Sequence, residues 1–177
     1  VNGTLYAWYN STVAPSACSA AVVLLTALEA PDTASPLIVV YVIISSSILI
    51  YQRLDANLEL INSFVEKGVP KKQIILTGHS CGGWMTMMLM SRHPDEVGGG
   101  ISLMQACYGK LSRHHKVKKV GVEKALEKFR KKSGDGPADM RQKQIDEIKK
   151  SKNLPVLVFT HPKDPYDGLL SDWVEEI

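Results

Sequence analysis

The sequence predicts an α/β fold with a mostly parallel sheet. Short apolar runs of the kind found in buried parallel strands alternate along the chain with segments of helical periodicity. Residues 73–77 form one such run, and residues 84–90 form an apolar helical segment directly after it. The glycine-rich stretch Gly-His-Ser-Cys-Gly-Gly joins the two. The 177 residues are 45% hydrophobic, enough for one sizeable core, so we expect a single domain over residues 1–177.

The other elements are predicted around this unit in chain order. Residues 36–44 are apolar and rich in β-branched side chains, which favours a buried strand. A helix is predicted to be capped by Asp55 and to end at Gly68, with an apolar face made of Leu58, Ile61, Phe64 and Val65. Residues 97–104 and 154–160 predict the next two strands.

The segment between the last two strands is basic. Its lysines and arginines alternate with acidic residues, and aromatic residues are nearly absent, which favours two solvated amphipathic helices broken at residues 133–137. A formal net charge of +3 is too small to indicate a polyanionic partner. We therefore expect no nucleic-acid partner.

The glycine-rich turn predicts a nucleophile elbow. A serine raised on a tight strand-to-helix turn has a strained backbone, which leaves no room for side chains two positions away on either side. Gly78 and Gly82 hold those positions around Ser80. The amide of Cys81, at the start of the next helix, is then placed to stabilise an oxyanion. The alternative is an ordinary glycine turn in which Ser80 only caps the helix.

With this order of strand, turn and helix, the chain resembles the α/β-hydrolase family, and within it the esterases, dienelactone-hydrolase-like enzymes and related serine peptidases. The resemblance covers residues 54–110 and 153–173. It implies an α/β-hydrolase-type sheet with helices on both faces and a small helical insertion near 111–152 that acts as a lid or cap. It also implies a final strand and helix, which we expect to be missing from this sequence.

The same resemblance implies a catalytic triad. Asp164 follows the predicted strand at 154–160, where the family has its triad acid, and Asp167 is the neighbouring alternative. In the family the histidine follows the acid, but no histidine lies between Asp164 and Ile177. The weak candidates for the general base are His161, His114 and His115.

These residues predict a serine hydrolase of carboxylesterase type. It would cleave an ester or related acyl bond of a small-molecule substrate through an acyl-enzyme at Ser80. The alternative is a non-catalytic α/β-hydrolase-like binding or interaction protein that keeps the elbow and lacks the general base. The substrate and the oligomeric state are not predicted.

Only one donor of the oxyanion hole can be assigned, and the cysteines indicate no metal site. The family's first oxyanion loop usually opens with His-Gly, but residues 45–51 contain no such pair, so only the Cys81 amide is assigned. Cys18, Cys81 and Cys107 are an odd number with no metal-ligand spacing. We therefore expect no metal site, no disulfide framework and no cofactor.

Charge is absent from most of the first third of the chain. Residues 1–52 contain Glu29 and Asp32 as their only charges. Residues 37–51 are largely apolar, yet the run is shorter than the roughly 18 to 20 residues of a membrane-spanning helix. No basic residue precedes the apolar stretch at 16–28, which disfavours a secretory signal. A membrane anchor is thus the weaker alternative to a soluble protein, cytoplasmic in preference to exported.

Overall fold

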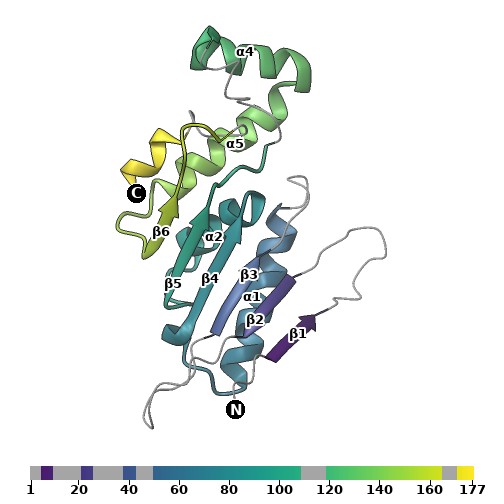
Figure 1. The fold of residues 1–177 in the computed structure, drawn as a ribbon, viewed down its shortest axis with the longest axis vertical. Helices are drawn as coiled ribbons and strands as arrows, with labels where there is room; N and C mark the ends of the chain where they lie inside the picture. The colour runs from purple at the N-terminus through teal and green to yellow at the C-terminus, as the bar shows by residue number, and fades with distance from the viewer. Residues whose placement is uncertain (1–4, 10–20, 26–37, 43–49, 109–118, 165–170) are drawn as a thin grey trace.

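The computed structural model describes residues 5–9, 21–25, 38–42, 50–108, 119–164 and 171–177. They form one six-stranded mixed sheet in which the strand order equals the chain order (Figure 1). The strands are β1 (Leu5–Tyr9), β2 (Ala21–Leu25), β3 (Ile38–Val42), β4 (Ile74–His79), β5 (Gly99–Leu103) and β6 (Val156–Phe159).

The first two pairings of the sheet are antiparallel, and the next three are parallel. The helices connect or flank the parallel strands: α1 (Ile50–Glu66), the 3-10 helix η1 (Lys71–Gln73), α2 (Cys81–Arg92), α4 (Val122–Ser133), α5 (Asp135–Ile148) and the 3-10 helix η3 (Asp172–Glu176). The α/β class is therefore confirmed, as is the order of the strands and helices predicted from residue 36 onward, whereas β1, β2 and the two 3-10 helices were not predicted.

Two details differ from the sequence prediction. Helix α1 begins at Ile50, so Asp55 is an exposed residue inside the helix and does not cap it. Parallel strands that follow one another in order place their connecting helices on one face, and α1 and α2 lie together on one side of the sheet (Figure 1). The resemblance implies helices on both faces of the sheet. Among the described residues, however, no helix covers the other face, where Leu157 and Phe159 of β6 are 58% and 46% exposed.

Helix α2 is the centre of the hydrophobic core. All its residues from Cys81 to Met90 are buried, because the sheet covers one side of the helix and other helices cover the rest. Gly100 of β5 allows the close approach, since a Cβ there would lie 3.0 Å from Cγ2 of Thr86 and 3.2 Å from Cγ of Met90. The largely apolar sequence of α2 up to Met90 is consistent with burial on all sides.

Trp84 joins α2 to the insertion and to the end of the chain. Its indole packs edge-on against Tyr108 and against Trp173 of η3, with ring centroids 5.5 and 5.6 Å apart. Its Nε1 donates to Oε1 of Gln144 at 2.7 Å, and the Tyr108 hydroxyl donates to the same oxygen at 2.6 Å. One buried amide of α5 therefore satisfies two aromatic donors.

The insertion forms the two helices that were expected. They break at Gly134, which has a φ of 78° and ends α4. Helix α5 packs against α2 and buries Ile145 and Ile148, while α4 packs against α5 and extends away from the sheet (Figure 1). Helix α5 is therefore part of the core, and the expectation of a solvated helix is wrong for it.

The Gln144 hydrogen bonds predict a large effect of one polar residue on stability. Replacing Gln144 with Leu leaves the Trp84 and Tyr108 donors buried without an acceptor, so the free energy of unfolding is expected to fall by about 2–3 kcal/mol in urea titrations. Gln142→Leu, on the exposed side of the same helix, is the matched control and is expected to change it by less than about 0.5 kcal/mol. Equal effects of the two substitutions would contradict the role of Gln144 as the acceptor of both hydrogen bonds.

Tyr108 predicts a loss of stability at alkaline pH. Burial raises the pKa of its phenol above the ordinary value, and the negative charge of ionised Tyr51 adds to the rise. Above about pH 10 the unfolded chain releases the Tyr108 proton while the folded chain retains it, so the free energy of unfolding falls as the pH rises. Urea titrations from about pH 9 to 11 are expected to show a shallower fall in Tyr108→Phe, and parallel curves for the two proteins would contradict this.

Candidate active site

Ser80 lies between the last residue of β4 and the first residue of α2, with φ 56° and ψ −120°. This positive φ is costly for a residue with a side chain, and such strain is found where the surrounding structure enforces it. The Ser80 N–H donates to Leu103 O at 2.9 Å, and its carbonyl accepts from Trp84 N and Ala106 N at 3.1 and 3.2 Å. Three backbone hydrogen bonds thus hold the turn in place.

The turn closes because two positions around Ser80 lack side chains. A Cβ on Gly78 would lie 2.3 Å from the carbonyl carbon of Gly82, a distance that real Cβ atoms do not show. A Cβ on Gly83 would lie 2.9 Å from Oγ of Ser102 and 3.0 Å from the Gly78 oxygen. This geometry requires glycine at position 78, and Gly83 shares the requirement, whereas the need for glycine at position 82 stays a prediction.

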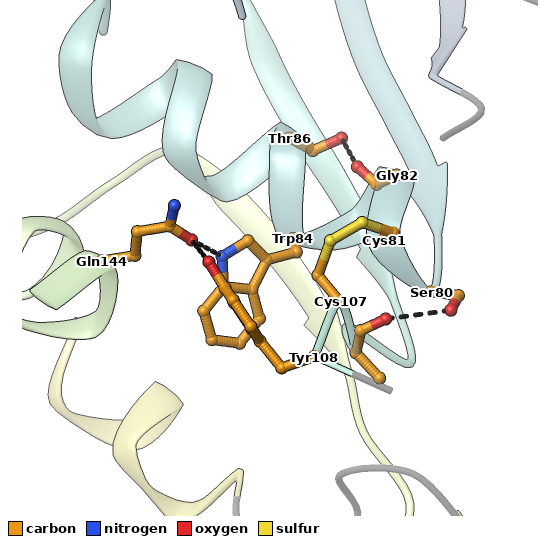
Figure 2. Close-up of a disulfide and its surroundings, with 9 residues drawn as sticks. Ser80, Cys81, Gly82, Trp84, Thr86, Cys107, Tyr108 and Gln144 are labelled. Carbon is orange, nitrogen blue, oxygen red and sulfur yellow. Dashed lines mark hydrogen bonds between the residues drawn. A yellow bond between two sulfur atoms is a disulfide. The ribbon is translucent and has the colours of Figure 1, made fainter. Parts of the chain in front are cut away.

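The Ser80 hydroxyl faces away from the helix that it precedes. Its Oγ makes no capping hydrogen bond with α2, so the interpretation of Ser80 as an ordinary capping serine is wrong. Instead, Oγ donates to the carbonyl of Ala106 at 3.0 Å (Figure 2). The hydroxyl is partly buried and is positioned by the segment that follows β5.

The start of α2 can stabilise negative charge beside Ser80. Cys81 is the first helical residue, and helix geometry leaves its N–H without an acceptor inside the helix. The positive end of the helix dipole lies at the same place. This amide is the predicted oxyanion donor, and the structure places it directly after Ser80. Of the second expected loop, residues 45–49 lie outside the described residues, and Ile50 and Tyr51 belong to α1.

A disulfide joins Cys81 to Cys107 (Figure 2). The expectation of no disulfide framework is therefore wrong for this pair. Both are well buried, at 6% and 8% exposed. A topological signal was available, because each cysteine follows shortly after a predicted parallel strand, and the carboxyl ends of neighbouring parallel strands meet at one edge. The disulfide was not predicted because the sequence contains an odd number of cysteines.

The segment from Met104 to Tyr108 is the part of the site that sequence reasoning missed. It supplies the Ala106 carbonyl and the Cys107 sulfur, and its first residue, Met104, has a φ of 46°. In the sheet, His79 is level with Leu103, so Ser80 and Met104 are the first residues beyond two paired strand ends. Two strained residues therefore lie side by side at the same edge.

Asp164 and His161 lie in the turn that follows β6. Asp164 is partly buried, and its N–H donates to His161 O at 2.8 Å. The His161 ring is exposed, and its Nδ1 accepts from Lys163 N at 3.1 Å, which places the proton of the neutral ring on Nε2. A triad base needs the opposite arrangement, with the proton on Nδ1. The structure does not bring His161 into hydrogen-bond contact with Ser80.

The remaining candidates for site residues lie outside the described residues. These are His114, His115 and Asp167. Of the other histidines, His79 ends β4 with an exposed side chain, and the His93 N–H donates to Leu89 O at 2.8 Å at the end of α2. Neither was assigned a catalytic role.

The chain matches no family model, no curated protein and no solved structure. In the part of the chain that the structure describes, no group of three or more metal-ligating side chains is gathered in one place. None of the helices in that part has the length and apolarity needed to span a bilayer.

The close approach at Gly78 predicts a strict requirement for glycine. Gly78→Ala is expected to lower the free energy of unfolding by about 3 kcal/mol or more, because its Cβ would overlap the backbone of Gly82. Gly136→Ala is the control, since only the ring of the following Pro137 opposes a Cβ there, and its loss of stability is expected to be much smaller. Thermal and urea unfolding of both variants measures the difference, and a neutral Gly78→Ala would contradict the geometry of the turn.

Proposed function

We propose that this protein is a serine hydrolase of α/β-hydrolase type, which cleaves an ester or related acyl bond through an acyl-enzyme at Ser80. The observation that carries the proposal is the conformation of Ser80, strained on a strand-to-helix turn in which Gly78 and Gly83 leave no room for a side chain. A capping serine needs no such strain. Backbone strain of this kind is typical of functional sites.

In the proposed mechanism, Oγ of Ser80 forms a bond to the carbonyl carbon of the substrate while a general base removes the hydroxyl proton. The carbonyl oxygen becomes an oxyanion and accepts a hydrogen bond from the Cys81 N–H. The oxyanion collapses, the leaving group departs with the proton from the base, and the acyl group remains on Ser80. Water then attacks the acyl-enzyme by the same steps and releases the acid.

Asp164 is proposed to orient the base. Ser80 follows β4 and Asp164 follows β6, and both strands are parallel to β5, which lies between them. Both residues therefore belong to the carboxyl edge of the sheet. The two strand ends are separated by roughly 10 Å, twice the usual spacing of strands. His114 and His115 are the histidines proposed as the general base.

A second candidate function is supported by the hydrogen bond of Ser80. The hydroxyl donates to a backbone carbonyl, and no histidine is bound to it among the described residues. This arrangement suits a non-catalytic α/β-hydrolase-like protein that binds a ligand at the elbow. The test of the proposed nucleophile separates the two functions.

Ser80→Ala is expected to abolish both the turnover of a small activated ester and the covalent labelling by a fluorophosphonate, because the attacking oxygen is lost. Intact-mass spectrometry measures the labelling. Ser91→Ala is the matched control on the same helix, where Oγ donates to Met88 O and has no proposed part in the reaction. Turnover that persists in Ser80→Ala would sink the assignment, and a wild-type protein that is never labelled would favour the binding function.

Asp164→Asn is expected to lower the turnover of the same ester by orders of magnitude while the protein stays folded, because an amide cannot stabilise the positive charge on the base. Steady-state kinetics measure the effect. Asp167→Asn is the comparison, and a loss confined to that variant would transfer the role to Asp167.

A further inference from the structure

We propose that the Cys81–Cys107 disulfide holds the elbow in a restrained state, and that its reduction releases Ser80 for reaction. This inference rests on the proposed function and adds a regulatory element to it. It starts from the segment Met104–Tyr108, which contacts the elbow through both its backbone and a side chain.

Two consecutive residues of the segment, Ala106 and Cys107, make three contacts with the elbow. Cys107 is bonded to Cys81, the residue after Ser80. The Ala106 N–H donates to the Ser80 carbonyl at 3.2 Å, and the Ala106 carbonyl accepts the Ser80 hydroxyl at 3.0 Å. The disulfide therefore keeps a hydrogen-bond acceptor against the proposed nucleophile.

This acceptor opposes the reaction. A carbonyl that accepts a hydrogen bond from the hydroxyl stabilises the neutral form of serine. Unlike a general base, it cannot remove the proton. The hydroxyl must leave the Ala106 carbonyl before a base can accept its proton. The contact is thus autoinhibitory for a serine nucleophile.

The attached conformation carries two local costs. Met104 has a φ of 46°, which is unfavourable for a residue with a side chain. Gln105 is 1% exposed, and neither its Nε2 nor its Oε1 has a hydrogen-bond partner among the described residues. Buried polar groups without partners are rare in folded proteins and destabilise them. Both costs favour another conformation of the segment once the disulfide no longer holds it.

The chemical step is a two-electron thiol–disulfide exchange. A dithiol reductant attacks one sulfur, forms a mixed disulfide, and then closes its own disulfide as it leaves. Cys81 and Cys107 each gain one hydrogen, and the dithiol loses two. Because both sulfurs are well buried, we expect the exchange to follow a local opening of the segment and to be slow.

The experiment compares the oxidised and reduced forms in a Cys18→Ser background, which removes the third thiol from the exchange. Dithiothreitol is the reductant, and a mass gain of about 2 Da confirms reduction. Two quantities are measured: the rate at which a fluorophosphonate labels Ser80, and the hydrogen exchange of peptides that cover residues 104–108. Cys107→Ser is the variant that lacks the disulfide in any redox state.

In the reduced protein and in Cys107→Ser we expect labelling to be about tenfold faster, the factor that corresponds to the loss of one hydrogen bond to the hydroxyl. We also expect faster exchange of residues 104–108, and a return to slow labelling when the reduced protein is reoxidised. Reversibility distinguishes release of the segment from unfolding, which circular dichroism also monitors.

Equal or slower labelling after reduction, or unchanged exchange of residues 104–108, would overturn the inference and leave the proposed function standing. A protein that is labelled in neither form would contradict the proposed function, and the inference would fail with it. The two failures are therefore distinguishable.

Discussion

The close approach between the end of β4 and the first turn of α2 is the constraint on which the rest of the site depends. Gly78 and Gly83 permit this contact, and the chain between them must turn through Ser80 with a positive φ. Once the turn has formed, the Cys81 amide, the Ser80 hydroxyl and the Ala106 carbonyl have fixed places relative to one another. The geometry of the candidate site follows from the close packing at two glycines.

The same helix start is anchored by the core. Trp84 is one turn beyond Ser80, and its indole is held by the Gln144 amide and by two aromatic neighbours. Further along α5, Glu147 forms an ion pair with Arg92 at the end of α2, and this hydrogen bond raises the pKa of the Arg92 guanidinium. Helix α5, which lies about 60 residues later in the chain, therefore helps to hold the first turn of α2 in place.

Much of the fold could be predicted from local patterns. The strands around residues 74–79, 99–103 and 156–159 are short apolar runs, and the break at Gly134 follows from glycine chemistry, so neither depends on distant parts of the chain. The start of α1 was missed because Asp55 offers a strong local cap, whereas Ile50 is included through burial against the core. A long-range contact prevailed over a local preference there.

In the candidate site, the sequence pointed to Ser80, Cys81 and Gly78, because all three belong to one contiguous motif. The Ala106 carbonyl could not be predicted, since a backbone oxygen has no sequence signature. The Cys81–Cys107 disulfide and the two hydrogen bonds to Gln144 depend on which strand ends and helix faces meet in space. Residue types alone do not determine such meetings.

The strand order has a consequence for how the chain folds. Every strand of the described sheet pairs only with strands that are its neighbours in sequence, so no pairing skips over a strand. Such a sheet can extend one strand at a time as the chain leaves the ribosome. Cys81 and Cys107 are 26 residues apart, within one strand–helix–strand unit. The pair can therefore meet before residues 119–177 have been synthesised, which leaves the elbow shaped while its supporting helix is still absent.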